Sequence, residues 1–145
     1  MRHMLPLALS LTYAENALRL AIANPSQSPV SLWSPSYSFG HDSVSFQVRP
    51  LKGKPCSIKK IARRWTVNIP GSLAIQPGDT YLQTFHLNDG TWDTSLCGDV
   101  DPRTEIEISA VLEIAQDDNA VTYGIVTGRY ESNRLRFKSM KEIVN

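Results

Sequence analysis

Charged side chains in this sequence are segregated into a basic stretch and an acidic stretch. Between positions 49 and 64 there is no acid, and the basic residues are Arg49, Lys52, Lys54, Lys59, Lys60, Arg63 and Arg64. Between positions 89 and 118 Arg103 is the only base, and the acids are Asp89, Asp93, Asp99, Asp101, Glu105, Glu107, Glu113, Asp117 and Asp118. Such stretches can steer a partner of opposite charge. Alternatively, they are solvated faces that neighbour and offset each other.

The acidic stretch contains a long segment, Asn88–Pro102, that combines four carboxylates with Trp92. Long loops in compact domains are often functional, and aromatic side chains dominate interface hot spots. We therefore predict a partner-binding site made of loop residues and basic residues: Asp89, Trp92, Asp93, Asp99, Asp101, Lys59, Lys60, Arg63 and Arg64. The alternative for Trp92 is a side chain that caps the edge of the core.

Residues that could carry catalysis or hold a metal are scattered. His3, His41 and His86 show no His-x-x-x-His spacing, and the chain has no Cys-x-x-Cys, nucleophile elbow or phosphate-binding glycine loop. The loop carboxylates could bind calcium, but their spacing does not match the twelve-residue calcium loop. Cys97 with His86 as a base has no support from spacing. We expect no catalytic residue, no metal site and no cofactor.

Nucleic acid is a rival partner for the basic stretch, with Trp65 beside Arg63 and Arg64 as a stacking platform. The formal net charge is only +1, and the acidic stretch would repel a phosphate backbone. A protein partner is therefore favoured. The two cysteines, Cys56 and Cys97, either pair or remain reduced thiols, since their number fixes neither geometry nor compartment.

Alternating apolar and polar residues predict the strands that must position these groups, and Ile106–Ile114 is the clearest case. Turn-forming residues separate the strands, and no window has a helical period. Ten segments are candidate strands, near 5–13, 17–24, 29–34, 43–49, 57–69, 72–76, 80–88, 104–115, 120–128 and 133–139, and the short 72–76 segment is the weakest of them. We predict an all-β, antiparallel sandwich of about eight or nine strands with little helix, as a single domain over 1–145 with a frayed tail at 140–145.

The predicted core is formed by the leucines of the first two strands, Trp65, and the apolar faces of Ile106–Ile114 and Val121–Ile125. The N-terminus has a basic start and an apolar run, as a signal peptide would. Its leucines alternate with smaller residues, however, and Tyr13-Ala14-Glu15 is a poor cleavage site, so we interpret it as a strand. No segment approaches the ~20 apolar residues of a membrane span. We expect no membrane span, and the sequence leaves the compartment open between cytoplasm and periplasm.

Three fragments, Leu20–Val30, Leu73–Thr80 and Gly124–Phe137, together resemble small bacterial immunoglobulin-like domains. The resemblance covers most of the chain and concerns its architecture. Cys56 and Cys97 stand in turn-like contexts, so the antibody-type pairing of a Trp with two cysteines of the core is not expected. The resemblance implies an immunoglobulin-like sandwich similar to periplasmic adhesion modules, intracellular proteinase inhibitors and immunity proteins that neutralise toxins.

We therefore predict a non-enzymatic protein-binding module, an inhibitor or immunity protein that occludes a toxin or protease. The alternative is a structural domain that assembles with copies of itself through a sheet edge or through its charge patches. A homo-oligomer would then take the place of a foreign protein partner.

Overall fold

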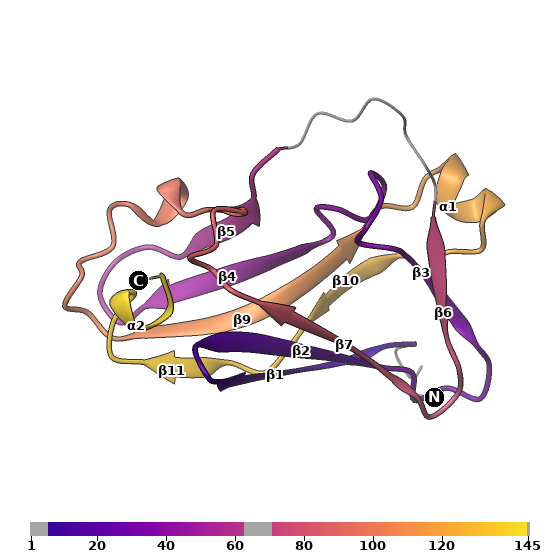
Figure 1. The fold of residues 1–145 in the computed structure, drawn as a ribbon, viewed down its shortest axis with the longest axis horizontal. Helices are drawn as coiled ribbons and strands as arrows, with labels where there is room; N and C mark the ends of the chain where they lie inside the picture. The colour runs from indigo at the N-terminus through magenta and orange to yellow at the C-terminus, as the bar shows by residue number, and fades with distance from the viewer. Residues whose placement is uncertain (1–5, 63–70, 145) are drawn as a thin grey trace.

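Two antiparallel sheets face each other across a hydrophobic core in the computed structural model, which describes residues 6–62 and 71–144 (Figure 1). The smaller sheet has the strand order β1-β2-β7. Its strands are β1 (Ala8–Ala14), β2 (Ala17–Ala23) and β7 (Thr80–Phe85). The predicted all-β sandwich is confirmed, whereas the immunoglobulin-like arrangement of its strands stays a prediction.

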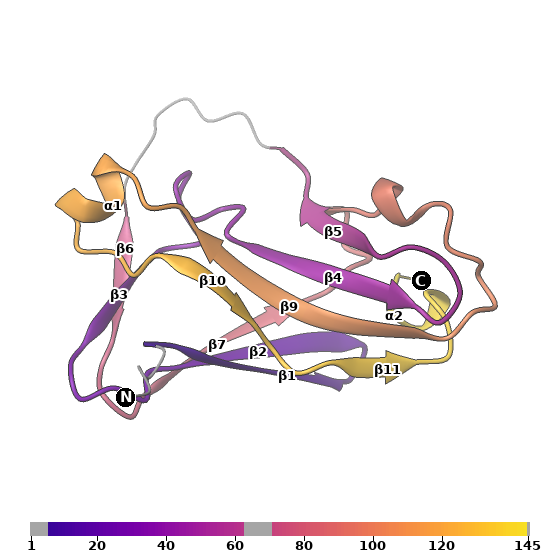
Figure 2. The same cartoon turned by 180° about the vertical axis from the view of Figure 1, so that it is seen from behind.

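The larger sheet has the order β10-β9-β4-β5-β8, and β11 also pairs with β9 (Figure 2). Its strands are β4 (Val44–Pro50), β5 (Cys56–Lys60), β8 (Trp92–Asp93), β9 (Ile106–Ile114), β10 (Gly128–Glu131) and β11 (Leu135–Phe137). A separate ladder joins β3 (Val30–Trp33) to β6 (Ser72–Ile75). The described residues thus form eleven strands, more than the eight or nine expected.

The core consists of the inward-facing residues of both sheets, because side chains on a strand alternate between its two faces. Its largest fully buried apolar side chains are Phe46, Leu11, Leu18, Leu20, Ile22, Ile58, Ile106, Ile108 and Val48. The Ile106–Ile114 face and four leucines of the first two strands therefore lie where the alternation predicts: Leu7, Leu11, Leu18 and Leu20. Leu5 lies outside the described residues. The predicted strand at 57–69 ends at Lys60, and Trp65 lies outside the described residues.

The strand expected at 120–128 is wrong, because a helix, α1 (Asp118–Thr122), and a turn occupy its first half, and β10 begins only at Gly128. The Asp117 side chain accepts a hydrogen bond from the Ala120 amide at 2.8 Å, which starts the helix, and Gly124 with φ of 64° follows its end. Val121, expected in the core, is 70% exposed, and Ala120 is buried instead. The Asp117 cap and Gly124 therefore favour a helix at a place where a short alternation of apolar residues had predicted a strand.

The tail expected to fray at 140–145 instead forms α2 (Lys141–Val144). Met140 and Ile143 are buried in the core. The Tyr13 hydroxyl donates to the Glu142 carbonyl at 3.0 Å, and the Glu142 carboxylate accepts from the Lys138 amide at 2.8 Å. The Tyr13 bond ties the C-terminal residues to β1, and the Lys138 bond holds the turn that precedes α2. No helix among the described residues is long and apolar enough to cross a membrane.

A fully buried asparagine, Asn24, connects the end of β2 to β6 and to the following turn. Its amide nitrogen donates to the carbonyls of Ser28 and Ile75 at 2.8 and 2.9 Å. Its amide oxygen accepts from the amide and the hydroxyl of Ser26 at 3.0 and 2.6 Å. Both donors and both acceptor positions are satisfied, which is what makes a buried amide tolerable.

Replacing Asn24 with aspartate (N24D) tests this connection without changing side-chain size. The variant loses both donors and buries a carboxylate against two carbonyl oxygens, so we expect the free energy of unfolding to fall by about 3 kcal/mol. Urea unfolding followed by circular dichroism measures the change. The exposed Asn88, changed in the same way, should alter stability by less than about 0.5 kcal/mol. Equal effects at the two positions would contradict the assignment.

Candidate functional site

The acidic loop, Asn88–Pro102, is built by turns in which aspartates bond to their own backbone. Asp89, Asp93 and Asp101 each accept a hydrogen bond from the amide two residues ahead, at 2.8, 2.9 and 2.9 Å. These bonds are typical of Asx turns. The Ser95 bonds also hold the pKa of Asp93 below its usual value. Three of the four predicted loop carboxylates therefore shape the loop, while all four, including Asp99, stay exposed.

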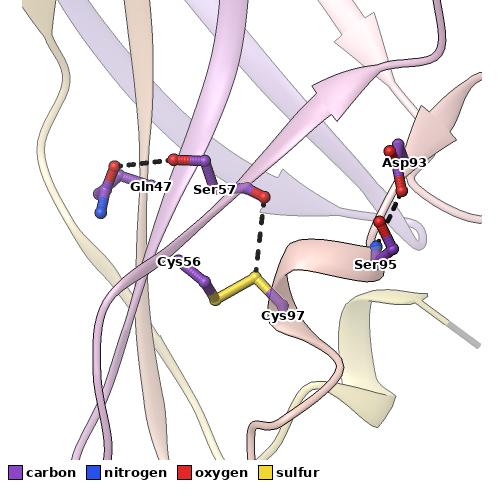
Figure 3. The surroundings of a disulfide bond; sticks show 6 residues. All are labelled: Gln47, Cys56, Ser57, Asp93, Ser95 and Cys97. Carbon is purple, nitrogen blue, oxygen red and sulfur yellow. Dashed lines mark hydrogen bonds between the residues drawn. A yellow bond between two sulfur atoms is a disulfide. The ribbon is translucent and has the colours of Figure 1, made fainter.

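A disulfide between Cys56 and Cys97 fastens the middle of the acidic loop to β5 (Figure 3). The two Cα atoms lie 5.3 Å apart, and Cys97 closes the 3₁₀ turn η1 (Ser95–Cys97). The Cys97 sulfur also contacts the Ser57 carbonyl oxygen at 3.9 Å, a contact without a proton to share because the sulfur is oxidised. Pairing settles the two alternatives left by the sequence. It also removes Cys97 as a nucleophile.

The basic stretch and the acidic loop are neighbours, because β5 pairs with β8. Lys59 lies opposite Asp93, and Lys60 lies opposite Trp92. The Lys60 ammonium is 5.8 Å from the centre of the Trp92 ring, within the range of a cation–π contact. Burial lowers the pKa of Lys60, while the charges of Asp42 and Asp89 oppose the shift. The two stretches therefore lie side by side here, as the solvated-face alternative expected, but only Asp89 of the acidic stretch acts on Lys60, and no ion pair joins them among the described residues.

Lys59 and Lys60 also face carboxylates on their other side. Both lysines line a hollow of about 690 Å³ that is shared with Asp42, Glu113 and Asp117. Charges of both signs therefore surround them, which does not favour a phosphate backbone over a protein. Arg63 and Arg64, the other two basic site residues, lie outside the described residues.

The burial of Trp92 does not favour the partner-binding role predicted for it. Its side chain is only 6% exposed and packs against Phe46 and Phe85, with ring centres 5.1 and 5.5 Å away. An indole enclosed in this way is unavailable to a partner unless the core opens. Trp92 instead fixes the start of the acidic loop to the core, which is the alternative that the sequence left open.

The residue that sequence reasoning missed is Leu96, at the centre of the 3₁₀ turn. Its side chain is 63% exposed although the next residue, Cys97, is held in the disulfide. Leu96 is thus an exposed apolar side chain on a turn held by a disulfide, and Asp93 and Asp99 lie three residues before and after it in the sequence. A signal existed in the sequence, since Leu96 is the only large aliphatic residue between Trp92 and Val100.

The acids on β9 have partners that the two-stretch pattern did not indicate. Glu107 forms ion pairs with Arg134 and Arg136 at 3.6 and 3.5 Å, and Glu113 forms one with Arg129 at 3.7 Å. Because β10 and β11 pair with β9, arginines from the end of the chain neutralise these carboxylates. The β9 carboxylates therefore differ from Asp93, Asp99 and Asp101 of the loop, which form no ion pair within the described residues.

Glu131 is the centre of a half-buried polar cluster on the outer face of the larger sheet. Its Oε2 accepts from the Ser109 hydroxyl at 2.7 Å and lies 3.1 Å from the Arg49 guanidinium. The Ser109 bond, followed by the charge of Arg49 and the bond from Arg129, holds the pKa of Glu131 below its usual value. Arg49, counted in the basic stretch, is thus occupied here and does not face the acidic loop.

Loss of the disulfide should destabilise the fold, because the bond closes a loop of 41 residues in the unfolded chain. We expect the double variant C56S/C97S to lose roughly 3–4 kcal/mol of unfolding free energy. Urea unfolding with and without a reductant measures this. The reductant should destabilise the wild type and leave the double variant unchanged. A wild type that is insensitive to reductant would contradict the prediction.

Stability should also depend on pH through Glu131. Since its pKa is lower folded than unfolded, its contribution is complete above the unfolded value of about 4.3 and is lost as pH falls through the folded value. We expect E131Q to cost roughly 1 kcal/mol at neutral pH and to flatten the acid side of the stability curve. The control is E15Q, whose side chain is 86% exposed. Parallel curves for wild type and E131Q would refute this.

Among the described residues, no three His, Cys, Asp or Glu side chains are grouped as metal ligands. No protein-family model, no curated protein and no solved structure matches this chain. Its function is therefore to be inferred from the geometry of the acidic loop and of the surfaces around it.

Proposed function

We propose that this chain is a non-enzymatic protein-binding module of the inhibitor or immunity type. Its acidic loop would occlude the active site of a toxin or a protease. The observation that carries the proposal is Leu96, 63% exposed on a turn that is anchored by a disulfide. An exposed apolar side chain is informative where the backbone beneath it is rigid, because binding then costs little conformational entropy.

The loop is rigid at several points along its length. Trp92 anchors its start in the core, the Cys56–Cys97 bond holds its middle, and Asx turns at Asp93 and Asp101 shape the chain on either side of Leu96. A preorganised loop of this kind can enter a partner's cleft without first becoming ordered.

The charges define the partner that fits. Asp93, Asp99 and Asp101 are exposed in the same loop as Leu96, and none of them forms an ion pair within the described residues. A complementary surface has an apolar pocket for Leu96 and a basic rim for the carboxylates. Such a rim accelerates association through long-range attraction and makes the affinity sensitive to salt.

The test is capture of a partner from a lysate of the source organism at low salt by immobilised wild type, L96D and D99K. A matched control is L51D, because Leu51 is 75% exposed but lies in the β4–β5 connection. We expect one protein to be retained by wild type and L51D. Its affinity for L96D should fall about thirtyfold, as for a hot spot of ~2 kcal/mol. The isolated partner's activity should decrease stoichiometrically as wild type is added.

Two outcomes contradict the proposal. One is a set of retained proteins that is the same for wild type and L96D. The other is a captured protein whose activity is unaffected by saturating amounts of this chain.

A further inference from the structure

Among the described residues, some strand edges of the two main sheets have their backbone groups covered by other residues, and the outer edge of β7 does not. On β1, the Asn133 side chain accepts from the Leu11 amide at 2.7 Å and donates to the Leu11 carbonyl at 3.0 Å, as a neighbouring strand would. On β5, the short β8 and the disulfide-linked η1 cover the edge. An open edge invites pairing with another chain, and proteins usually cover or charge it.

The outer edge of β7 has no such cover. This strand pairs with β2 on one side only, and its other backbone edge has no hydrogen bond from any described residue. The sequence Thr80–Phe85 contains no charge and no proline, the residues that normally block an edge. A hollow of about 320 Å³ borders the strand, between Tyr81–Phe85 and the Asp89–Trp92 segment.

Hydrogen-bond alternation shows which backbone groups on β7 face outward. The Asn24 amide bonds to the Asp79 carbonyl at 3.0 Å, so every second residue from Asp79 bonds to β2. The amides and carbonyls of Leu82 and Thr84 then point away from β2. The same alternation can be followed across β2 to β1. There it leaves the backbone amide and carbonyl of Leu11 pointing away from β2, in agreement with their bonds to Asn133.

We infer that this edge pairs with a second copy of the chain, antiparallel and centred on Leu82. The outward-facing residues read Thr80, Leu82, Thr84, which is symmetric about the leucine. A two-fold axis places Leu82 against Leu82 of the partner subunit, and Thr80 against Thr84 of the partner subunit. In each such pair, both backbone hydrogen bonds are exchanged. Self-complementary contacts of this kind are what a two-fold dimer requires.

A second copy would bury the exposed Leu82 side chain and pair the threonines, in addition to forming the backbone hydrogen bonds. Leu82 is 70% exposed, and the pairing covers it with an identical leucine. Threonines opposite each other are a favourable cross-strand pair, and the strand brings no like charges together. A single short strand pair buries less surface area than the interface of a permanent dimer, so we expect association only at high protein concentration. The paired residues lie on β7 and not in the acidic loop, although the Asp89–Trp92 start of that loop borders the same hollow. The inference goes beyond the proposed function.

Sedimentation equilibrium over a wide concentration range tests the inference, with wild type compared to L82K and L82P. Lysine charges the edge, and proline removes the outward amide without removing a bond to β2. We expect a reversible dimer for the wild type that is insensitive to salt, and a monomer for both variants. L51K, the same change at another exposed leucine, and L96D, in the acidic loop, should both still dimerise.

Hydrogen exchange gives a second measurement that needs no variant. The Leu82 and Thr84 amides should gain about tenfold protection at high protein concentration, whereas Tyr81 and Gln83, already bonded to β2, should not change. A wild type that stays monomeric at all concentrations overturns the inference and leaves the edge to a foreign strand. A dimer that L82K and L82P do not weaken, or one that salt dissociates, also overturns it.

Discussion

The packing of Trp92 against Phe46 and Phe85 is the contact on which both the sandwich and the acidic loop depend. Phe46 lies on β4 in one sheet and Phe85 on β7 in the other, with ring centres 5.4 Å apart. Trp92, on β8, completes the cluster at the point where the chain passes into the acidic loop. Aromatic rings bury large areas and prefer such edge-to-face arrangements. The same cluster therefore joins the sheets and fixes the loop to a rigid base.

The strands that were predicted well are those whose burial pattern is local. Along β2 and β9 the alternation continues for at least seven residues, and sheet formation follows from it directly. At 120–128 the same pattern was short, and the Asp117 cap with Gly124 produced a helix. On the outer face of β9, Ser109 is fully buried because the side chains of Arg49 and Glu131 cover it. These residues are distant in sequence, so no local pattern reveals the contact.

The charge segregation marked Asn88–Pro102 as a candidate site, and this site stays a prediction. The structural roles of its residues did not follow from composition. Composition could not show that three aspartates cap their own turns, or that the β9 acids are paired with arginines from β10 and β11. Nor could it separate Trp92, which packs inward, from Leu96, which points outward. Both distinctions require the strand pairing and the disulfide, which join residues 41 positions apart.

The two surfaces differ in the physical forces available to them, so they should respond differently to salt. The acidic loop offers charge around one apolar side chain, so its binding should weaken with salt. The β7 edge offers backbone hydrogen bonds and uncharged side chains, which salt hardly screens. A two-fold dimer through β7 would carry an acidic loop on each subunit, because the paired residues Thr80–Thr84 precede that loop. Two rigid loops at a fixed spacing raise the effective concentration for a partner that is itself dimeric or repetitive. Weak self-association would then increase occupancy without any change in the loop itself.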